Sequence, residues 1–448
     1  MIRLNKGWGL VLLVGQLLAC GTDRAADEKP LKPGVTQLDI FHFFSEGASI
    51  QPELAEQGKR FEAENPQYQI KWTWGGSESM QKIRARINAG DPPDAALASD
   101  ADVTFLAREN VAMALDDYLA GQNYEADARW QDTFWPGVLE HSLVADGAQG
   151  SHYYGIPWDA HISGIYYNKG LFASKGYSTP KTWDQLVGLC QTIQSEAGIA
   201  CFSADNFNAY NARLHLYIIV RLVGENILYD TATNLAGTSW TGHPGFLEAA
   251  RIAGEFTAKY YMPGWQGNQW PTGQMEWSNG GAAMIIMPTW LPPELRDVKA
   301  EDFVMDIFPF PYFEAGGGDP EVAEIKYNGW FIPTGAANPK GAIHFLKFLS
   351  SRTAQRENME TGQVPPVIKG VPLPKGAKGV GPILKGSGGM RFGAGLDADA
   401  REWLDKVFYP LNDQLLQGQL GAQVFIERLQ KEHEKFYASR PAGKKMGL

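Results

Sequence analysis

Acidic side chains at Glu46, Asp100 and Asp159 are the groups whose type and place in this chain could support chemistry. Two carboxylates about 5 Å apart, or roughly 6.5–9.5 Å apart, are the arrangement that cleaves glycosidic bonds. Carboxylates are also strong acceptors for the hydroxyl groups of a neutral polar ligand. Binding demands far less of the geometry than catalysis does, so we favour binding and keep glycan cleavage by these residues as an alternative.

Aromatic rings are the second chemical resource, because the chain contains 14 Trp. A pyranose has apolar C–H faces and a rim of hydroxyls. Flat aromatic rings cover such faces, and Asp, Glu and Asn accept hydrogen bonds from the rim. Core packing is the competing role, and we expect it for about half of the Trp. We assign Trp72 and Trp183 to the core and treat His42 and His161 as structural.

The signatures of several other function classes are missing. The sequence has no phosphate-binding P-loop, no G-x-G-x-x-G after a predicted strand, no G-x-S-x-G elbow and no H-E-x-x-H. None of its 8 His pairs with Cys at the spacing of a zinc site. The net charge of −10 repels polyphosphates. We therefore expect no metal, no cofactor and no nucleic-acid partner.

The elements that must carry these groups alternate between strands and helices. A chain of 448 residues exceeds the roughly 250–300 residues that one core supports, which predicts two lobes. Tyr68, Ile70, Trp72 and Trp74 alternate with polar residues, a period of two that indicates a strand. The apolar run at 38–44, the helix at 52–65, the helical stripe at 80–87 and the strand at 94–98 complete a β-α-β-α-β order. That order predicts an α/β fold with a mainly parallel sheet.

The second half repeats this pattern. Strands are predicted at 164–167 and 200–203, and Thr182 and Gln185 form a capping box that begins a helix. Another amphipathic stripe covers 342–349, and the Gly/Pro-rich residues 370–395 are expected to form a loop.

Ligands of open α/β sheets bind beyond the carboxyl ends of the strands. The residues just past the predicted strands are polar, small or aromatic, as expected of a pocket lining. They are 44–47, 74–77, 99–100 and 204–207.

The amino terminus has the form of an export signal. Arg3 and Lys6 precede an apolar run at 9–19, which is too short to cross a bilayer and suits a signal peptide. The run ends in LLAC, which resembles a lipobox, so we expect residues 1–19 to be removed and Cys20 to carry lipid. An ordinary cleaved signal is the alternative. Residues 20–35 are polar and predict a flexible tether.

Two further cysteines, Cys190 and Cys201, remain in the exported chain. An oxidising compartment permits a bridge between them. Spacing alone does not set the Cα distance, so a disulfide and two free thiols both stay open.

Several ordered motifs resemble a known family. YGIPWD at 154–159 is followed by GIYYNK at 164–169 and PKTW at 180–183, and these form the most specific segment. Further matches are AGDPPD at 89–94, NGGAAM at 279–284, NGW at 328–330 and GQVP at 362–365. Over roughly residues 36–440 the chain is similar to the family 1 extracellular solute-binding proteins. These are the sugar-binding lipoproteins of bacterial ABC importers, and the layout resembles that of the maltose-binding class.

The resemblance implies a two-lobed, type II periplasmic-binding-protein fold whose lobes are joined by three crossings, near 157–162, 303–311 and 351–357. The N-terminal lobe would hold residues 36–158 and 312–352. The C-terminal lobe would hold 159–311 and 353–440. Ligand would lie between the lobes, and their closure would create the surface that the permease recognises.

The family's pocket positions fall on ten residues of this chain: Phe44, Glu46, Asp100, Trp158, Asp159, Asn206, Phe207, Trp270, Trp290 and Trp330. Trp74 is added because it ends a predicted strand, and Arg391 because it is a cation in the glycine-rich segment. Trp277 stands where the family has a buried Phe, so we assign it to the core. Gly47 stands where maltose binders carry a basic residue, which leaves maltose specificity unsupported.

The resemblance therefore implies a monomeric, membrane-tethered binding protein. It would hold a neutral mono- or oligosaccharide, without catalysis or cofactor, on the periplasmic face or outer cell surface, and deliver it to an ABC permease. Two alternatives stay open. One is the glycan-cleaving enzyme considered above, and the other is a polyamine binder of the same fold that cages an ammonium among aromatic rings and carboxylates.

Overall fold

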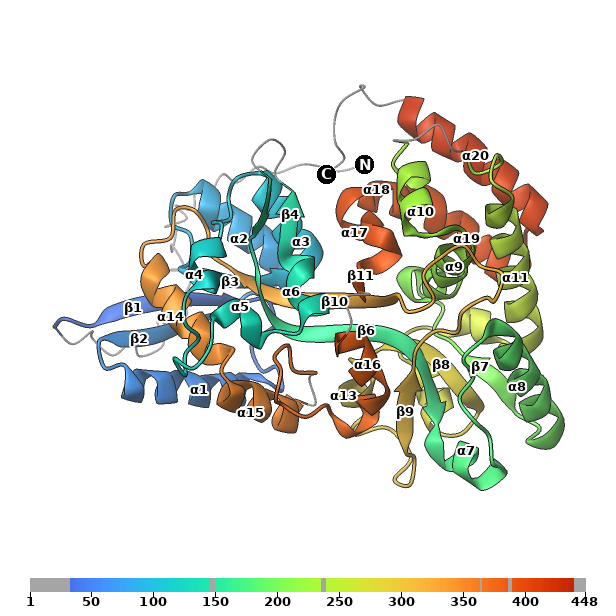
Figure 1. Cartoon of the computed structure of the whole chain (residues 1–448), viewed down its shortest axis with the longest axis horizontal. Helices are drawn as coiled ribbons and strands as arrows, with labels where there is room; N and C mark the ends of the chain where they lie inside the picture. The colour runs from blue at the N-terminus through green and yellow to red at the C-terminus, as the bar shows by residue number, and fades with distance from the viewer. Residues whose placement is uncertain (1–32, 146–149, 235–238, 363–364, 386–388, 439–448) are drawn as a thin grey trace, which may run out of the picture.

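The computed structural model describes residues 33–145, 150–234, 239–362, 365–385 and 389–438. Within them the chain forms two α/β lobes that share a sheet with strand order β2-β1-β3-β10-β6-β8-β7. Figure 1 shows β1, β2 and β3 in one lobe, β7 and β8 in the other, and β6 and β10 running between them. The two-lobed fold predicted from the sequence is confirmed.

The N-terminal lobe begins with the predicted β-α-β-α-β unit. Its elements are β1 (Thr36–His42), α1 (Gln51–Glu64), β2 (Tyr68–Trp74), α2 (Ser79–Asn88) and β3 (Ala95–Ser99). Strand β1 pairs in parallel with β2 and β3. Parallel strands need a crossover between them, and α1 and α2 supply it. Helix α3 (Asp100–Arg108) follows β3 directly, and a hairpin of β4 (Leu143–Ala145) and β5 (Ser151–Tyr153) lies beyond it.

The C-terminal lobe surrounds β7 (Ala200–Ser203) and β8 (Ala282–Pro288), which pair in parallel. The predicted capping box is present at the start of α8 (Trp183–Glu196), where Thr182 and Gln185 satisfy each other's backbone amides. Helices α9 (Asn208–Val223) and α11 (Pro244–Tyr260) pack on these strands, and α19 (Tyr409–Leu416) and α20 (Ala422–Ala438) pack on those two helices.

Two long strands connect the lobes. Strand β6 (Ile156–Asn168) and strand β10 (Ala323–Phe331) pair antiparallel near the middle of the sheet. Beyond this pairing, β6 pairs with β8 and with β9 (Met305–Phe308) in the C-terminal lobe, while β10 pairs with β3 in the N-terminal lobe. Strand β6 is therefore the first crossing between the lobes.

The other two crossings differ from the expected positions. Residues 303–311 include β9, which stays in the C-terminal lobe, and Tyr312 pairs with Thr182 there. The second crossing is therefore β10. Helix α15 (Arg352–Gly362) packs on α1 through an ion pair between Arg60 and Glu357, so the start of the expected 353–440 segment belongs to the N-terminal lobe.

Residues 370–395 contain more structure than the loop expected there. The described part includes α16 (Gly381–Lys385), β11 (Gly389–Met390) and the turn at Lys375–Val380. That turn packs on β9, and α16 packs on α6 (Pro136–Leu139) of the other lobe. Glycine and proline content correctly indicated frequent turns, but tertiary contacts order the turns into short elements.

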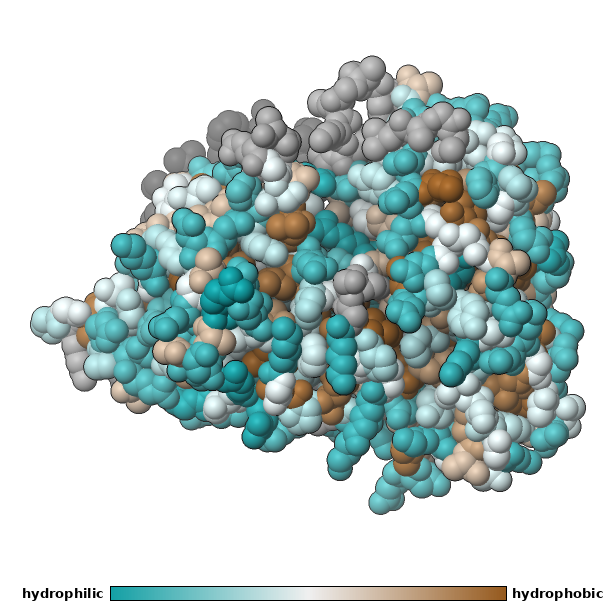
Figure 2. Space-filling view, in the orientation of Figure 1, coloured by the Kyte–Doolittle hydropathy of each residue, from teal (hydrophilic) through white to brown (hydrophobic). Residues whose placement is uncertain are grey.

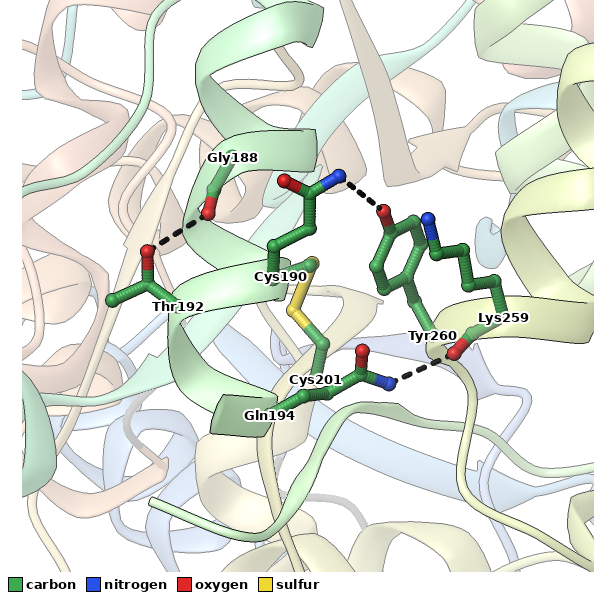
Figure 3. Close-up of a disulfide and its surroundings, with 8 residues drawn as sticks. Gly188, Cys190, Thr192, Gln194, Cys201, Lys259 and Tyr260 are labelled. Atoms are coloured by element: carbon green, nitrogen blue, oxygen red, sulfur yellow. Dashed lines mark hydrogen bonds between the residues drawn. A yellow bond between two sulfur atoms is a disulfide. The ribbon is translucent and has the colours of Figure 1, made fainter. Parts of the chain in front are cut away.

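Each lobe has a buried core. Trp183 and Trp277 lie in it, as predicted, and Trp72 is half-buried against Trp74. A disulfide joins Cys190 on α8 to Cys201 on β7, with the Cα atoms 5.2 Å apart (Figure 3). Both cysteines are fully buried. The bridge fixes the helix to the edge strand at one side of the C-terminal lobe.

Hydrophilic residues cover most of the face shown in Figure 2, with hydrophobic residues in scattered groups. Among the described residues, every helix is too short or too polar to cross a membrane. The predicted signal peptide at 1–19, the predicted lipidation site Cys20 and all but the last residues of the 20–35 tether lie outside the described residues.

Candidate functional site: the cavity between the lobes

A cavity of about 430 Å³ lies between the lobes. Its volume falls in the range of roughly 300–1,000 Å³ that is typical of small-molecule sites. Both lobes and both crossing strands contribute to its wall. The lining residues are Phe43, Phe44, Ser49, Ile50, Ser99, Asp100, Trp158, Asp159, His161, Thr289, Trp290, Pro293, Glu294, Lys326, Tyr327, Asn328, Gly362 and Pro365. The wall therefore combines aromatic rings with carboxylates, an amide and an ammonium.

An irregularity in β6 brings two adjacent side chains to this wall. Asn328 of β10 pairs with Asp159, and the next residue, Gly329, pairs with Pro157, so Trp158 has no partner on β10. Such a bulge bends a strand and re-aims its side chains, and bulges are frequent beside functional sites. In a regular strand, Trp158 and Asp159 would point to opposite faces. Here both line the cavity.

Asp159 is held rigidly at the junction of the lobes. Its Oδ1 accepts a hydrogen bond from the backbone amide of Asn328 at 2.8 Å, and its Oδ2 accepts one from Asn328 Nδ2 at 2.9 Å. His161 Nε2 lies 3.4 Å from Oδ2. Burial raises the pKa of Asp159, but His161 and the bonds from Asn328 outweigh burial and hold the pKa below its ordinary value. The side chain is thus an ionised acceptor at neutral pH.

Asp100 is the second buried carboxylate of the cavity and the first residue of α3. Ser99 caps this helix by accepting a bond from the amide of Asp102, which fixes the turn that carries Asp100. Burial raises the pKa of Asp100 to about 7; Lys326 opposes this rise, and Asp397 reinforces it. Near neutral pH this carboxyl therefore exchanges between acceptor and donor.

Lys326 supplies the ammonium group of the wall. Its Nζ lies 2.8 Å from Asp397 Oδ2, and Asp397 belongs to the short helix α17 (Leu396–Asp399). Burial lowers the pKa of Lys326, but Asp397 and Asp100 outweigh it, so the pKa is raised and the group stays charged. The cavity therefore contains a cation, but one already neutralised by a buried partner.

The aromatic wall has one part in each lobe. Trp290 follows β8, and its ring meets His161 edge-on at a centroid distance of 5.2 Å. On the N-terminal side, Phe44 and Trp158 pack around His42, at 4.9 Å and 5.5 Å between ring centroids. Burial lowers the pKa of His42 to about 3, so its ring is a neutral member of this cluster. Both histidines were expected to be structural, but their positions differ. His42 packs inside the aromatic cluster, whereas His161 lines the cavity.

The cavity brings together five of the residues proposed from the sequence: Phe44, Asp100, Trp158, Asp159 and Trp290. The other proposed residues are placed elsewhere.

Three residues of the N-terminal lobe fall outside the wall. Glu46 is exposed to solvent on the turn after β1. Trp74 packs on His42 and stacks on Trp72, with 5.7 Å between the two indole centroids, and is not part of the cavity wall. Trp330 is only 1% exposed and lies inside the N-terminal lobe, with its ring 6.4 Å from that of Trp158. It contacts the wall from behind.

Three residues of the C-terminal lobe lie on neighbouring loops beside the cavity. The amide of Asn206 donates to the carbonyl of Asn268 at 2.7 Å, which joins the loop of Phe207 to that of Trp270. Phe207 and Trp270 are each 53% exposed. Burial raises the pKa of Glu294, a wall residue, and a hydrogen bond from Trp270 opposes that rise. Trp270 therefore stands at the rim.

Arg391 connects the lobes outside the cavity wall. Its guanidinium donates to Thr104 Oγ1 at 3.2 Å and to the carbonyl of His141 at 2.6 Å, both in the N-terminal lobe. Arg391 directly follows β11, and the next residue, Phe392, packs in the core of the C-terminal lobe. Its role in this structure is to link the two lobes.

The sequence indicated neither Lys326 nor Glu294 as a wall residue. A single Lys in β10 and a single Glu at the end of the short helix α13 (Leu291–Glu294) carry no distinctive spacing. Asn328 was part of a matched motif, and its place directly before Gly329 and Trp330 was the one available signal. In the described part of the chain, no group of three or more His, Cys, Asp or Glu side chains could hold a metal ion.

Comparison with known proteins agrees with this geometry. Residues 44–356 match the family described as bacterial extracellular solute-binding protein. The match covers more than half of the chain, and the chain belongs to this family.

Similar proteins have names that refer to sugars. The diacetylchitobiose binding protein NgcE of Streptomyces coelicolor is 24% identical over 303 residues, which are 64% of this chain and 61% of that protein. The multiple sugar-binding protein of Streptococcus mutans is 21% identical over 81% of this chain and 82% of its own length. A solved chitin oligosaccharide binding protein superposes with a TM-score of 0.66 at 24% identity, over 90% of this chain and all of its own. This last likeness shows the shared fold.

Proposed function

We propose that this protein is an extracytoplasmic solute-binding lipoprotein that captures a neutral mono- or oligosaccharide between its lobes and delivers it to an ABC importer. The observation that carries the proposal is the composition of the cavity wall. Phe44 from one side and Trp290 from the other offer half-buried aromatic rings, the largely buried Trp158 completes the apolar wall, and Asp159 offers an ionised acceptor. That combination matches the two kinds of surface of a pyranose.

The charges of the wall disfavour an anionic guest. The Lys326 ammonium is paired with the buried carboxylate of Asp397, so it offers no free positive charge to a phosphate or sulfate. A phosphate or sulfate would face Asp100 and Glu294 as well. The names of the sugar-binding relatives agree with this choice of ligand class.

Isothermal titration calorimetry against a sugar panel tests the proposal. The panel holds diacetylchitobiose, longer chito-oligosaccharides, maltotriose, raffinose and xylobiose, with glucose 6-phosphate and spermidine as charged controls. We expect micromolar or tighter binding of at least one neutral sugar and no heat from the charged controls. Binding of spermidine alone would favour the polyamine alternative and would contradict the proposal.

Glycan cleavage remains the second candidate, because Asp100 and Asp159 line one cavity with pKa values shifted in opposite directions. Opposite shifts are typical of an acid and its partner in glycosidases. Chromatography of each panel sugar after prolonged incubation separates the two functions. We expect intact sugars, and shortened products that disappear in Asp100→Asn would establish the enzyme instead.

The anchoring proposal rests on Cys20. We propose that Cys20 carries lipid and tethers a monomer to the membrane, on the periplasmic face or the outer cell surface. Metabolic labelling with a palmitate analogue should mark the wild-type chain and leave Cys20→Ser unlabelled. Release of the wild-type protein into the medium without label would contradict the anchor while leaving the sugar site untouched.

A further inference from the structure

Behind Trp290 lies a buried cation that the binding role described above does not use. Arg213 of α9 is 3% exposed and is not part of the cavity wall. Its guanidinium carbon lies 5.3 Å from the ring centroid of Trp290, 5.4 Å from that of Tyr210 and 5.1 Å from that of Phe392. Trp290 faces the cavity, so Arg213 supports the ring from behind it.

The polar edge of the same guanidinium contacts both crossing strands. Nε lies 3.3 Å from Ser163 Oγ on β6, and Nη2 donates to Glu324 Oε1 on β10 at 3.2 Å. Glu324 is 2% exposed, so this is a buried ion pair. Arg213 therefore connects three elements: the loop that carries Trp290 and the two strands that pass between the lobes.

We propose that Arg213 is a positioning residue for the ligand, which fixes the indole of Trp290 as a platform and ties that platform to the crossing strands. A planar guanidinium can stack on rings with its face while its edge donates hydrogen bonds, and a lysine ammonium cannot do both. The proposal rests on the proposed function, because it assigns Trp290 to a bound sugar.

A purely structural role is the competing explanation. Removing Arg213 alone would leave the Glu324 carboxylate buried without its partner, which is strongly destabilising in general. The double variant R213M/E324Q removes both charges together and keeps similar volumes. Arg221 provides a matched control on the same helix. It is also buried, at 1% exposed, but it donates to the carbonyls of Phe310, Asp319 and Val322 and not to a neighbour of Trp290.

The first measurement needs no ligand. In protein labelled with 5-fluorotryptophan, the ¹⁹F resonance of Trp290 is identified by its absence from Trp290→Phe. We expect this resonance to shift and broaden in R213M/E324Q and to stay unchanged in R221M. A Trp290 resonance that is the same in wild type and R213M/E324Q would overturn the positioning role. This result does not depend on whether the protein binds sugar.

The second measurement is a double-mutant cycle with the tightest-binding sugar of the calorimetric panel. We expect R213M/E324Q to weaken binding about tenfold in the wild-type background and less than about twofold in the Trp290→Ala background, because coupled residues are non-additive. R221M should lower the melting temperature without changing the affinity of folded protein. An equal loss in both backgrounds would show that Arg213 does not act through Trp290. If no sugar binds, the proposed function fails and the ¹⁹F result alone judges the positioning.

Discussion

Replacing Trp290 by Ala should weaken sugar binding while leaving the fold intact. Trp290 is half-buried on the cavity wall, and its ring is set by His161, Tyr210 and Arg213. A sugar that covers roughly 60 Å² of the indole and loses a similar area of its own removes about 120 Å² from water. At about 25 cal/mol per Å², that area is worth about 3 kcal/mol if all of it is apolar. Sugar faces are partly polar, so we expect about 1–3 kcal/mol, or about 5- to 150-fold in Kd.

Calorimetry of Trp290→Ala with the best panel sugar, together with its melting curve, measures this effect. Trp330→Ala is the matched contrast. That side chain is 1% exposed, so truncation should cost about 3–5 kcal/mol of folding free energy and affect affinity only indirectly. Unchanged affinity in folded Trp290→Ala would refute the stacking role. A large loss of stability in Trp290→Ala with unchanged affinity would place this Trp in the core instead.

Three further predictions concern the acids and the disulfide. Asp159→Ala should weaken sugar binding and also lower the free energy of unfolding by about 1–3 kcal/mol, because the backbone amide and the side-chain amide of Asn328 lose their acceptor. Urea denaturation measures this loss, and a variant as stable as wild type would contradict the prediction. Asp100 has its pKa raised to about 7, so between about pH 4 and 7 the folded state holds a proton that the unfolded state releases. The protonated carboxyl therefore contributes its full stability below about pH 4, and this contribution is lost as the pH rises through 7. The free energy of unfolding of wild type relative to that of Asp100→Asn should fall between about pH 4 and pH 7. A difference between the two proteins that stays constant over this range would refute the raised pKa of Asp100. The Cys190→Ser/Cys201→Ser variant should lose about 3 kcal/mol of stability, from the loop-closure entropy of an 11-residue separation, without a change in affinity. A change in affinity at equal stability would show that the bridge shapes the cavity.

Local signals predicted the elements well. The alternation of Tyr68 to Trp74 coincides with β2, and the capping box at Thr182 begins α8 as expected. Both signals are local, because side-chain period and backbone capping depend on neighbours in sequence. The later crossings were misplaced for the opposite reason. Pairing of Tyr312 with Thr182 and of Arg60 with Glu357 joins segments far apart in sequence.

The site shows the same division. Trp158 and Asp159 came from a motif, yet a regular strand would place only one of them at the cavity, and the bulge opposite Asn328 and Gly329 is not visible in the sequence. Trp330 belongs to a matched motif as well, but it is 1% exposed and packs in the core of the N-terminal lobe. Lys326 became part of the wall because Asp397, distant in sequence, neutralises it there. Such pairings are properties of the folded chain.

A crystal structure grown with the tightest-binding panel sugar would show whether the cavity between the lobes is the binding site. We expect one sugar ring in that cavity, with a C–H face against Trp290 and a hydroxyl within hydrogen-bond distance of Asp159. Sugar bound only on an outer surface, with no guest between the lobes, would contradict it.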